Sequence, residues 1–147
     1  MVQETRFVAG NLIWPIFVIE GENRTEPIGT MPGVNRMSVD LAVKAAQHAV
    51  KLGVGAIAIF PVTPQDKKSE DGRHAVDSNN LICQATRAIR EATEDKIGIV
   101  CDVALDPYTS HGQDGILIDG YVANDETVQI LCDQSVNQAK AGATIIA

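Results

Sequence analysis

The chain has 147 residues, which is enough for one domain with a single hydrophobic core. Its hydrophobic fraction of 45% and charged fraction of 21% are ordinary for a globular domain. The formal net charge of −7 argues against a nucleic-acid partner, and no apolar run approaches the ~20 residues that span a bilayer, so we expect no membrane association.

Four short apolar runs alternate with three amphipathic stretches along the chain. None of the runs shows clean polar and apolar alternation, so each is predicted to be a strand of a parallel sheet covered on both faces. Pro15 cannot donate to a strand ladder and therefore indicates an edge position or a bulge in the first run. The runs are residues 12–19, 56–60, 97–105 and 143–147.

The stretches between the runs carry the start and stop signals of helices. Ser38 can cap a helix that stops at Gly53, and Asn80 can cap a second one. A third helix is predicted to open at Asn124 and to end at Gly142. The predicted buried stripes are Leu41, Ala45, Ala49 and Leu52 in the first helix and Val128, Leu131, Cys132, Ser135 and Ala139 in the third.

Long connections follow the strands and short ones follow the helices. This asymmetry is typical of a (β/α) barrel, whose active site lies on the face with the long loops. A whole barrel needs ~250 residues, so the chain accounts for about half of one. We predict an α/β fold, a partial (β/α)8 TIM barrel with about four parallel strands and three helices, over residues 1–147. The long connections are residues 20–37, 61–80 and 106–123.

Three carboxylates follow the third apolar run. Asp102 and Asp106 are placed to face the same mouth if the strand ends near Ala104, and Asp114 could return on the loop. Such a group suits a hard cation such as Mg²⁺, or a substrate ammonium. In the alternative reading, the Asp-Pro and Asp-Gly pairs simply start turns. A charge directly after an apolar run is costly unless it has a partner, which favours a site.

Other polar residues have two readings each. His111 is either a ligand or proton shuttle, or an idle loop histidine. Lys67, Lys68 and Arg73 either contact an anionic substrate or form a solvated cluster. The three cysteines show no CxxC spacing, and a reduced, cytoplasmic setting is expected because no signal peptide is present. We expect Cys83, Cys101 and Cys132 to be packing residues.

The run from Asp102 to Gly115 resembles the metal-site segment of the porphobilinogen synthase (5-aminolevulinate dehydratase) family. The resemblance implies a (β/α)8 barrel enzyme, a lyase that condenses two 5-aminolevulinate molecules to porphobilinogen in tetrapyrrole (haem) biosynthesis. It also implies a homo-oligomer, an octamer in the family, and an allosteric Mg²⁺ whose site lies outside these residues. Residues 1–10 resemble a remnant of the family's N-terminal arm. Further similar segments, in the family's order, are residues 11–18, 31–33, 60–64, 68–75 and 120–127.

The resemblance also assigns roles to single residues. Zinc-dependent members carry cysteine at the positions of Ala104, Asp106 and Asp114, so no catalytic zinc is expected here. Asp106 and Asp114 could hold a metal other than zinc. Asp102 and Asp114 would line the pocket for the substrate that supplies the free amine, where they bind its ammonium or relay protons. Phe60 would form part of the pocket wall.

The two lysines that form Schiff bases in the family have no counterpart among the six lysines of this chain. We therefore expect the isolated chain to be inactive. Three other functions stay open: a self-associating half-barrel or assembly module without catalysis, a carboxylate metal-binding α/β domain, and an unrelated aldolase-type barrel.

Overall fold

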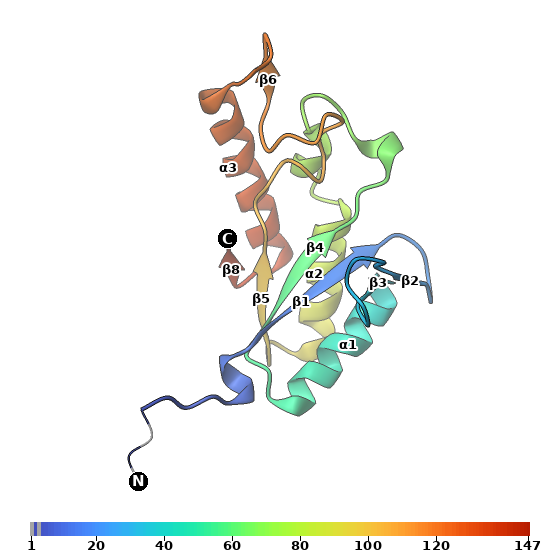
Figure 1. Cartoon of the computed structure of the whole chain (residues 1–147), viewed down its shortest axis with the longest axis vertical. Helices are drawn as coiled ribbons and strands as arrows, with labels where there is room; N and C mark the ends of the chain where they lie inside the picture. The colour runs from blue at the N-terminus through green and yellow to red at the C-terminus, as the bar shows by residue number, and fades with distance from the viewer. Residues whose placement is uncertain (1, 3) are drawn as a thin grey trace.

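The computed structural model describes residues 2 and 4–147, which form a six-stranded sheet with helices on one face (Figure 1). Four parallel strands follow one another in space in their chain order, as expected for a segment of a (β/α) barrel. They are β1 (Ile13–Ile19), β4 (Ala56–Pro61), β5 (Gly98–Cys101) and β8 (Ile145–Ile146), joined by helices α1 (Val39–Leu52), α2 (Leu81–Thr93) and α3 (Asn124–Ala141).

The predicted partial barrel is therefore confirmed, with four parallel strands and three helices in the expected order. The predicted ends of α1 and α3 are confirmed, as is the cap at the start of α2; Ser38 takes the N-cap position of α1, but its side chain makes no capping hydrogen bond. Gly53 and Gly142 adopt the left-handed conformation that closes α1 and α3, and the Asn80 side chain accepts a 3.0 Å hydrogen bond from the Cys83 amide at the start of α2. No helix among the described residues is long and apolar enough to cross a membrane.

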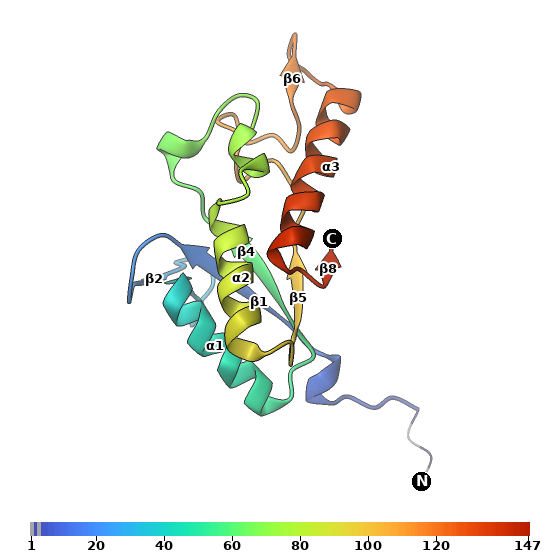
Figure 2. The same cartoon turned by 180° about the vertical axis from the view of Figure 1, so that it is seen from behind.

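Turning the molecule by 180° shows α1, α2 and α3 in front of the sheet (Figure 2). The strand side chains that face these helices form the core, together with small residues of α1 such as Ala42 and Ala46. On this face the strands contribute Ile16, Val18, Ile57, Ile59, Ile99 and Cys101, all almost fully buried. Cys83 and Cys101 are core residues, as predicted.

The opposite face of the sheet carries no helix among residues 2 and 4–147 (Figure 1). The side chains there are nevertheless apolar: Ile13 is 56% exposed, and Phe17 and Phe60 are half-buried. The expectation that both faces of each strand are covered therefore holds for one face only. Apolar residues on the uncovered face are what the lumen of a closed barrel requires.

Pro15 lies on the half of β1 that has β4 on one side and no other strand beside it in the described residues. A residue without an N–H is tolerated at such an edge, so the predicted edge position is confirmed. The second half of β1, from Phe17 to Ile19, pairs in parallel with β3 (Asn35–Ser38), which pairs in turn with β2 (Thr25–Pro27).

Two predicted loops contain regular structure. The loop after β1 holds β2 and β3, and the loop after β5 holds a small hairpin of β6 (Leu117–Ile118) and β7 (Tyr121–Val122). Strands this short contain too few residues for a period to be read from sequence. Short 3₁₀ turns occupy Ala9–Asn11, Gln65–Lys67 and Arg73–Val76. Residues 1 and 3 of the predicted arm remnant lie outside the described residues.

The predicted buried stripes of α1 and α3 are wrong in part. Ala49 of α1 is buried, but Leu52 is 57% exposed, because α1 turns Ala42, Ala46 and Ala49 toward the sheet. In α3, Val128, Cys132 and Ala139 are exposed. The buried residues of α3 are Thr127, Gln134, Gln138 and Ala141, and three of them are polar. The half-buried Ile130 and Leu131 pack against Ala75, Leu105 and Tyr108, so the inner face of α3 is partly polar and partly apolar.

Candidate functional site

Asp102 is the first residue after β5, and its side chain belongs to the uncovered face of the sheet. Successive strand residues alternate between faces, so Asp102 shares a face with Val100 while Ile99 and Cys101 point into the core. Phe17 and Phe60 occupy the same face of neighbouring strands, in direct register, with ring centroids 5.6 Å apart. An acidic group and an aromatic wall therefore meet at the carboxyl ends of three adjacent strands.

These residues line a hollow of about 440 Å³. The structure brings Asp102, Asp106 and Phe60 to it, as the sequence predicted. The strand before Asp102 ends at Cys101 rather than near Ala104, so the acidic segment leaves the sheet earlier in the chain than expected. The other lining residues are Phe17, Pro61, Val62, Thr63, Lys68 and Pro107.

Asp114 does not line this hollow among the described residues, but it supports the segment that does. Its Oδ1 accepts a 2.6 Å hydrogen bond from the Leu105 amide, which ties the loop back to the end of β5. Its charge still reaches Asp102, whose pKa it helps to raise. One oxygen of Asp114 thus organises the backbone, and its charge adds to the acidic mouth, while its role in the substrate pocket stays a prediction.

Burial raises the pKa of Asp102 above its usual range, and the charges of Asp106 and Asp114 raise that pKa further. Three carboxylates within electrostatic reach of one another favour any cation that binds among them. An ammonium group, or a proton taken up during reaction, would relieve this repulsion. The mouth is thus chemically suited to an amine.

The raised pKa of Asp102 predicts a specific pH dependence of stability. Because the folded state binds this proton more tightly than the unfolded state, Asp102 contributes most favourably below its ordinary pKa, and that contribution is lost as pH rises through the folded value. We expect Asp102→Asn to be more stable than the wild type at pH 7, with the gain shrinking toward pH 4. Urea unfolding at both pH values measures it.

Asp133→Asn is the matched control, because Asp133 is exposed on α3 and the change in net charge is identical. Equal unfolding free energies for the two variants at pH 7 would contradict the expectation that the Asp102 charge destabilises the folded state.

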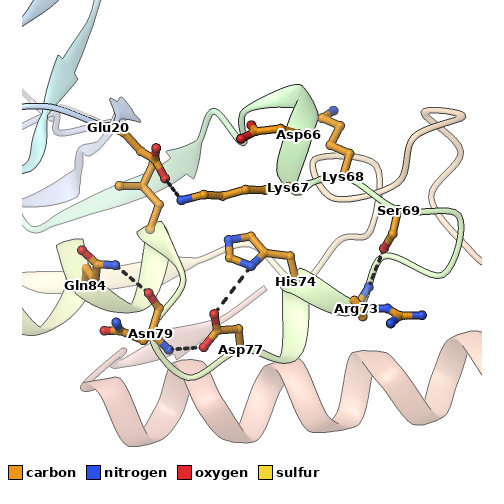
Figure 3. Close-up of a pocket in the computed structure, with 11 residues that line it drawn as sticks. Glu20, Asp66, Lys67, Lys68, Ser69, Arg73, His74, Asp77, Asn79 and Gln84 are labelled. Carbon is orange, nitrogen blue, oxygen red and sulfur yellow. Dashed lines mark hydrogen bonds and ion pairs between the residues drawn. The ribbon is translucent and has the colours of Figure 1, made fainter.

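A second hollow, of about 760 Å³, lies beside the first on the loop between β4 and α2 (Figure 3). Lys67 forms an ion pair with Glu20 across it, and this contact raises the pKa of Lys67. Arg73, which also lines this hollow, donates to Asp71 at 2.7 Å. The predicted cationic cluster is therefore largely paired with carboxylates.

The residues that sequence reasoning missed in this second hollow are Glu20, His74 and Asp77. The Nδ1 of His74 lies 3.6 Å from Asp77 Oδ2 (Figure 3). Glu20 directly follows β1, so the rule that chemistry gathers at strand ends could have found it. Lys68 lines both hollows, and its Nζ lies 3.5 Å from the Asp106 carbonyl oxygen.

His111 joins two loops. Its Nε2 lies 3.0 Å from the Glu70 carbonyl oxygen, and its Nδ1 accepts a 3.1 Å hydrogen bond from the Gln113 amide. Both ring nitrogens are thereby engaged with backbone. The histidine is neither idle nor free to ligate, and it holds the loop after β5 against the loop after β4.

The donors at the mouth do not fit a metal centre. In the part of the chain that the structure describes, no group of three or more His, Cys, Asp or Glu side chains is arranged to hold an ion. The thiols are elsewhere: Cys83 and Cys101 are buried on the helix side, and Cys132, predicted to be a packing residue, is exposed on α3. The carboxylate metal-binding reading therefore gains no support from the geometry, and no chemical step is assigned to a metal here.

Comparisons with known proteins identify what this arrangement is similar to. The family model described as delta-aminolevulinic acid dehydratase matches residues 1–147. A delta-aminolevulinic acid dehydratase of Bradyrhizobium diazoefficiens is 51% identical over 147 residues, covering 100% of this chain and 41% of the relative. The chloroplastic delta-aminolevulinic acid dehydratase 1 of Arabidopsis thaliana is 42% identical over 146 residues, covering 98% of this chain and 34% of the relative.

A solved structure gives the same result. The crystal structure of the Toxoplasma gondii ME49 delta-aminolevulinic acid dehydratase (porphobilinogen synthase), in complex with the reaction product porphobilinogen, superposes with a TM-score of 0.91 at 35% identity. The match covers 99% of this chain and 41% of that one. The chain thus spans about two fifths, or less, of the length of these relatives.

Proposed function

Because the chain belongs to the delta-aminolevulinic acid dehydratase family, we propose that it supplies one part of a porphobilinogen synthase, a lyase of tetrapyrrole biosynthesis. The observation that carries this proposal is the acidic mouth: Asp102 and Asp106 lie with Phe60 at the carboxyl ends of adjacent parallel strands. That is the place where (β/α) barrels carry out their chemistry.

In the proposed reaction, two 5-aminolevulinate molecules are joined with the loss of two waters. One substrate keeps a free amine, which becomes the aminomethyl group of porphobilinogen. Asp102 would hold this amine as an ammonium and exchange protons with it, for which its raised pKa is favourable. Phe17 and Phe60 would close one side of the pocket against water and so strengthen these electrostatic contacts.

The composition of the mouth supports a non-zinc form of the enzyme. Ala104 has no ligand atom, and Asp114 directs Oδ1 to the Leu105 amide. Hard carboxylates do not reproduce the thiolate set that selects zinc. An allosteric Mg²⁺ held outside this chain, a homo-octamer and a cytoplasmic location extend this proposal, and all three rest on the resemblance.

Combining the chain with a complementary segment tests the proposal. The chain is produced joined to the portion of the Bradyrhizobium diazoefficiens relative that lies beyond the matched region, and porphobilinogen formation from 5-aminolevulinate is measured. Turnover by the joined protein is expected. A well-folded joined protein that forms no porphobilinogen would refute the proposed function, and the unmodified relative serves as the positive control.

Self-association is a second candidate property, favoured by the exposed apolar residues at the edges of the sheet. Ile145 and Ile146 of the edge strand β8 are 47% and 39% exposed, and Ile13 on the open side of β1 is 56% exposed. Unpaired strand edges and apolar faces of this kind promote association. We expect the 147-residue chain to sediment as dimers or larger species at micromolar concentration.

Ile145→Lys and Ile146→Lys together should shift that equilibrium toward monomer, because charges on an edge strand oppose pairing. Lys140→Ala on exposed α3 serves as a control away from the edge. A monodisperse monomer for the wild-type chain at these concentrations would contradict the second candidate.

A further inference from the structure

Two glutamines of α3 are buried although glutamine is ordinarily a surface residue. Gln134 and Gln138 are 0% and 1% exposed, and they lie four residues apart on the inner face of the helix. Both views show α3 running alongside β5 and the segment that follows it (Figures 1 and 2). The two amides therefore lie between the helix and the segment that carries the acidic mouth.

Each glutamine donates to a carbonyl of that segment. Gln138 Nε2 donates to the Asp102 carbonyl at 2.9 Å, and Gln134 Nε2 donates to the Ala104 carbonyl at 3.1 Å. The spacing matches on both sides: four helical residues rise about 6.0 Å, and two extended residues advance about 6.6 Å. Side chains of α3 thus bind the carbonyls of this segment as the amides of a neighbouring strand would. They do so directly after the last residue of β5.

The other side of the segment is held through its amides. The Val103 amide donates to the Ala147 carbonyl at 2.8 Å, and the Leu105 amide donates to Asp114 Oδ1 at 2.6 Å. The carbonyl of Cys101, which precedes the segment, accepts from the Ala147 amide at 3.0 Å. The Asp102 backbone is therefore bound at its own carbonyl and at the residues on both sides, which limits its freedom and holds its side chain toward the mouth.

Packing alone does not account for these glutamines. Among residues 2 and 4–147, the Oε1 atoms of Gln134 and Gln138 find no hydrogen-bond partner, and the Tyr108 hydroxyl approaches Gln134 without a bond of ordinary geometry. Burying an amide oxygen without a partner is unfavourable, and an apolar side chain would avoid that cost. What an apolar side chain lacks is the N–H that binds the carbonyls of Asp102 and Ala104.

We propose that Gln134 and Gln138 are positioning residues that fix the Asp102 segment at the mouth through its carbonyl oxygens. The inference rests on the proposed function only in taking Asp102 as the group that meets the substrate; the contacts themselves do not depend on it. Neither glutamine touches the hollow lined by Asp102 and Phe60 among the described residues, so both act through the backbone.

Gln138→Met tests the proposal, because methionine has a similar length and shape and no N–H. Two properties are measured in the 147-residue chain: the pH titration of the Asp102 carboxyl by ¹³C NMR, and hydrogen exchange of the segment 102–108 by mass spectrometry. We expect exchange there to accelerate about tenfold, the loss of one buried hydrogen bond, and the titration midpoint of Asp102 to fall as its segment becomes hydrated. Exchange in α1 should not change.

Ser135→Ala is the matched control, since Ser135 lies on the same helix and its hydroxyl donates only to the Leu131 carbonyl of that helix at 2.7 Å. If Gln138→Met does not fold, Gln138→Asn keeps the amide but withdraws the donor by one methylene, and the same changes are expected. An unchanged Asp102 midpoint, or exchange that accelerates equally in α1 and in segment 102–108, would overturn the proposal. Neither readout requires catalysis, so its failure is distinguishable from failure of the proposed function.

Discussion

The purified 147-residue chain is expected to form porphobilinogen at a rate at least about three orders of magnitude below that of the joined protein, because it lacks an amine nucleophile at the mouth. A Schiff-base lysine must be largely uncharged at neutral pH, which requires burial or neighbouring cations. The lysines of this chain do not meet that condition: Lys44, Lys51, Lys67, Lys96 and Lys140 are exposed.

Two lysines lie near enough to the hollows to be considered. Lys67 is paired with Glu20, and the pairing raises its pKa, which is opposite to what a nucleophile needs. Lys68 is half-buried and lines the mouth together with Asp102 and Asp106, and its Nζ lies 3.5 Å from the Asp106 carbonyl oxygen, so its surroundings supply acidic groups and a carbonyl rather than a second cation. Neither is suited to attack a ketone.

A colorimetric assay of porphobilinogen over hours, with the chain alone and with the joined protein side by side, measures this difference. Circular dichroism confirms that the isolated chain is folded during the assay. Turnover by the folded chain alone at a rate comparable to that of the joined protein would contradict the expectation, and Lys68→Met would then show whether Lys68 is the nucleophile.

In the joined protein, Asp102→Ala should reduce kcat by about 10²–10⁴, the usual range for removing a positioned proton-transfer group. The carboxylate is the member of the acidic mouth that shares a face with Phe60 and whose pKa is raised by burial and by its two acidic neighbours. Its loss removes the charge that would hold the substrate amine, so KM for 5-aminolevulinate should also rise.

Asp133→Ala in the same joined protein is the control, because Asp133 is exposed on the outer surface of α3 and far from the mouth in sequence. Asp106→Asn should give a smaller loss than Asp102→Ala, since Asp106 is exposed at the rim. Full activity for Asp102→Ala with a normal fold would exclude Asp102 from the chemistry.

The architecture could be predicted from sequence because its signals are local. The apolar runs, the helix starts at Ser38 and Asn80 and the stops at Gly53 and Gly142 each reflect a few neighbouring residues. The strand order follows because successive parallel strands joined by helices pack side by side. The short strands β2 and β3 could not be predicted, since their pairing depends on where the end of β1 lies in space.

The inner face of α3 shows why a hydrophobic stripe can mislead. Val128 and Cys132 form the more apolar side of the helix, yet they are exposed, and Gln134 and Gln138 take the inner side. The reason is tertiary: the carbonyls of Asp102 and Ala104 need donors, and only polar side chains supply them. The periodicity of hydrophobic residues does not show which buried carbonyls require a hydrogen-bond donor.

The candidate site was predictable in part. The position of Asp102 after an apolar run placed it at a strand end, whereas Phe60 was expected only from the resemblance and Phe17 was not expected. The hydrogen bond between Asp114 and the Leu105 amide depends on loop conformation, and so do the contacts of His111 with two backbone segments. The spacing of residues in the sequence does not predict loop conformation. The identity of the substrate was inferred from the family resemblance, because the geometry of the site does not identify it.

A crystal structure of the joined protein soaked with 5-aminolevulinate tests the central idea most directly. The amine nitrogen of the bound substrate is predicted to lie within hydrogen-bond distance, about 2.7–3.1 Å, of a carboxylate oxygen of Asp102 beside the Phe60 ring. A substrate bound elsewhere, with Asp102 and Asp106 left in bulk water, would contradict the assignment of this acidic mouth as the amine site.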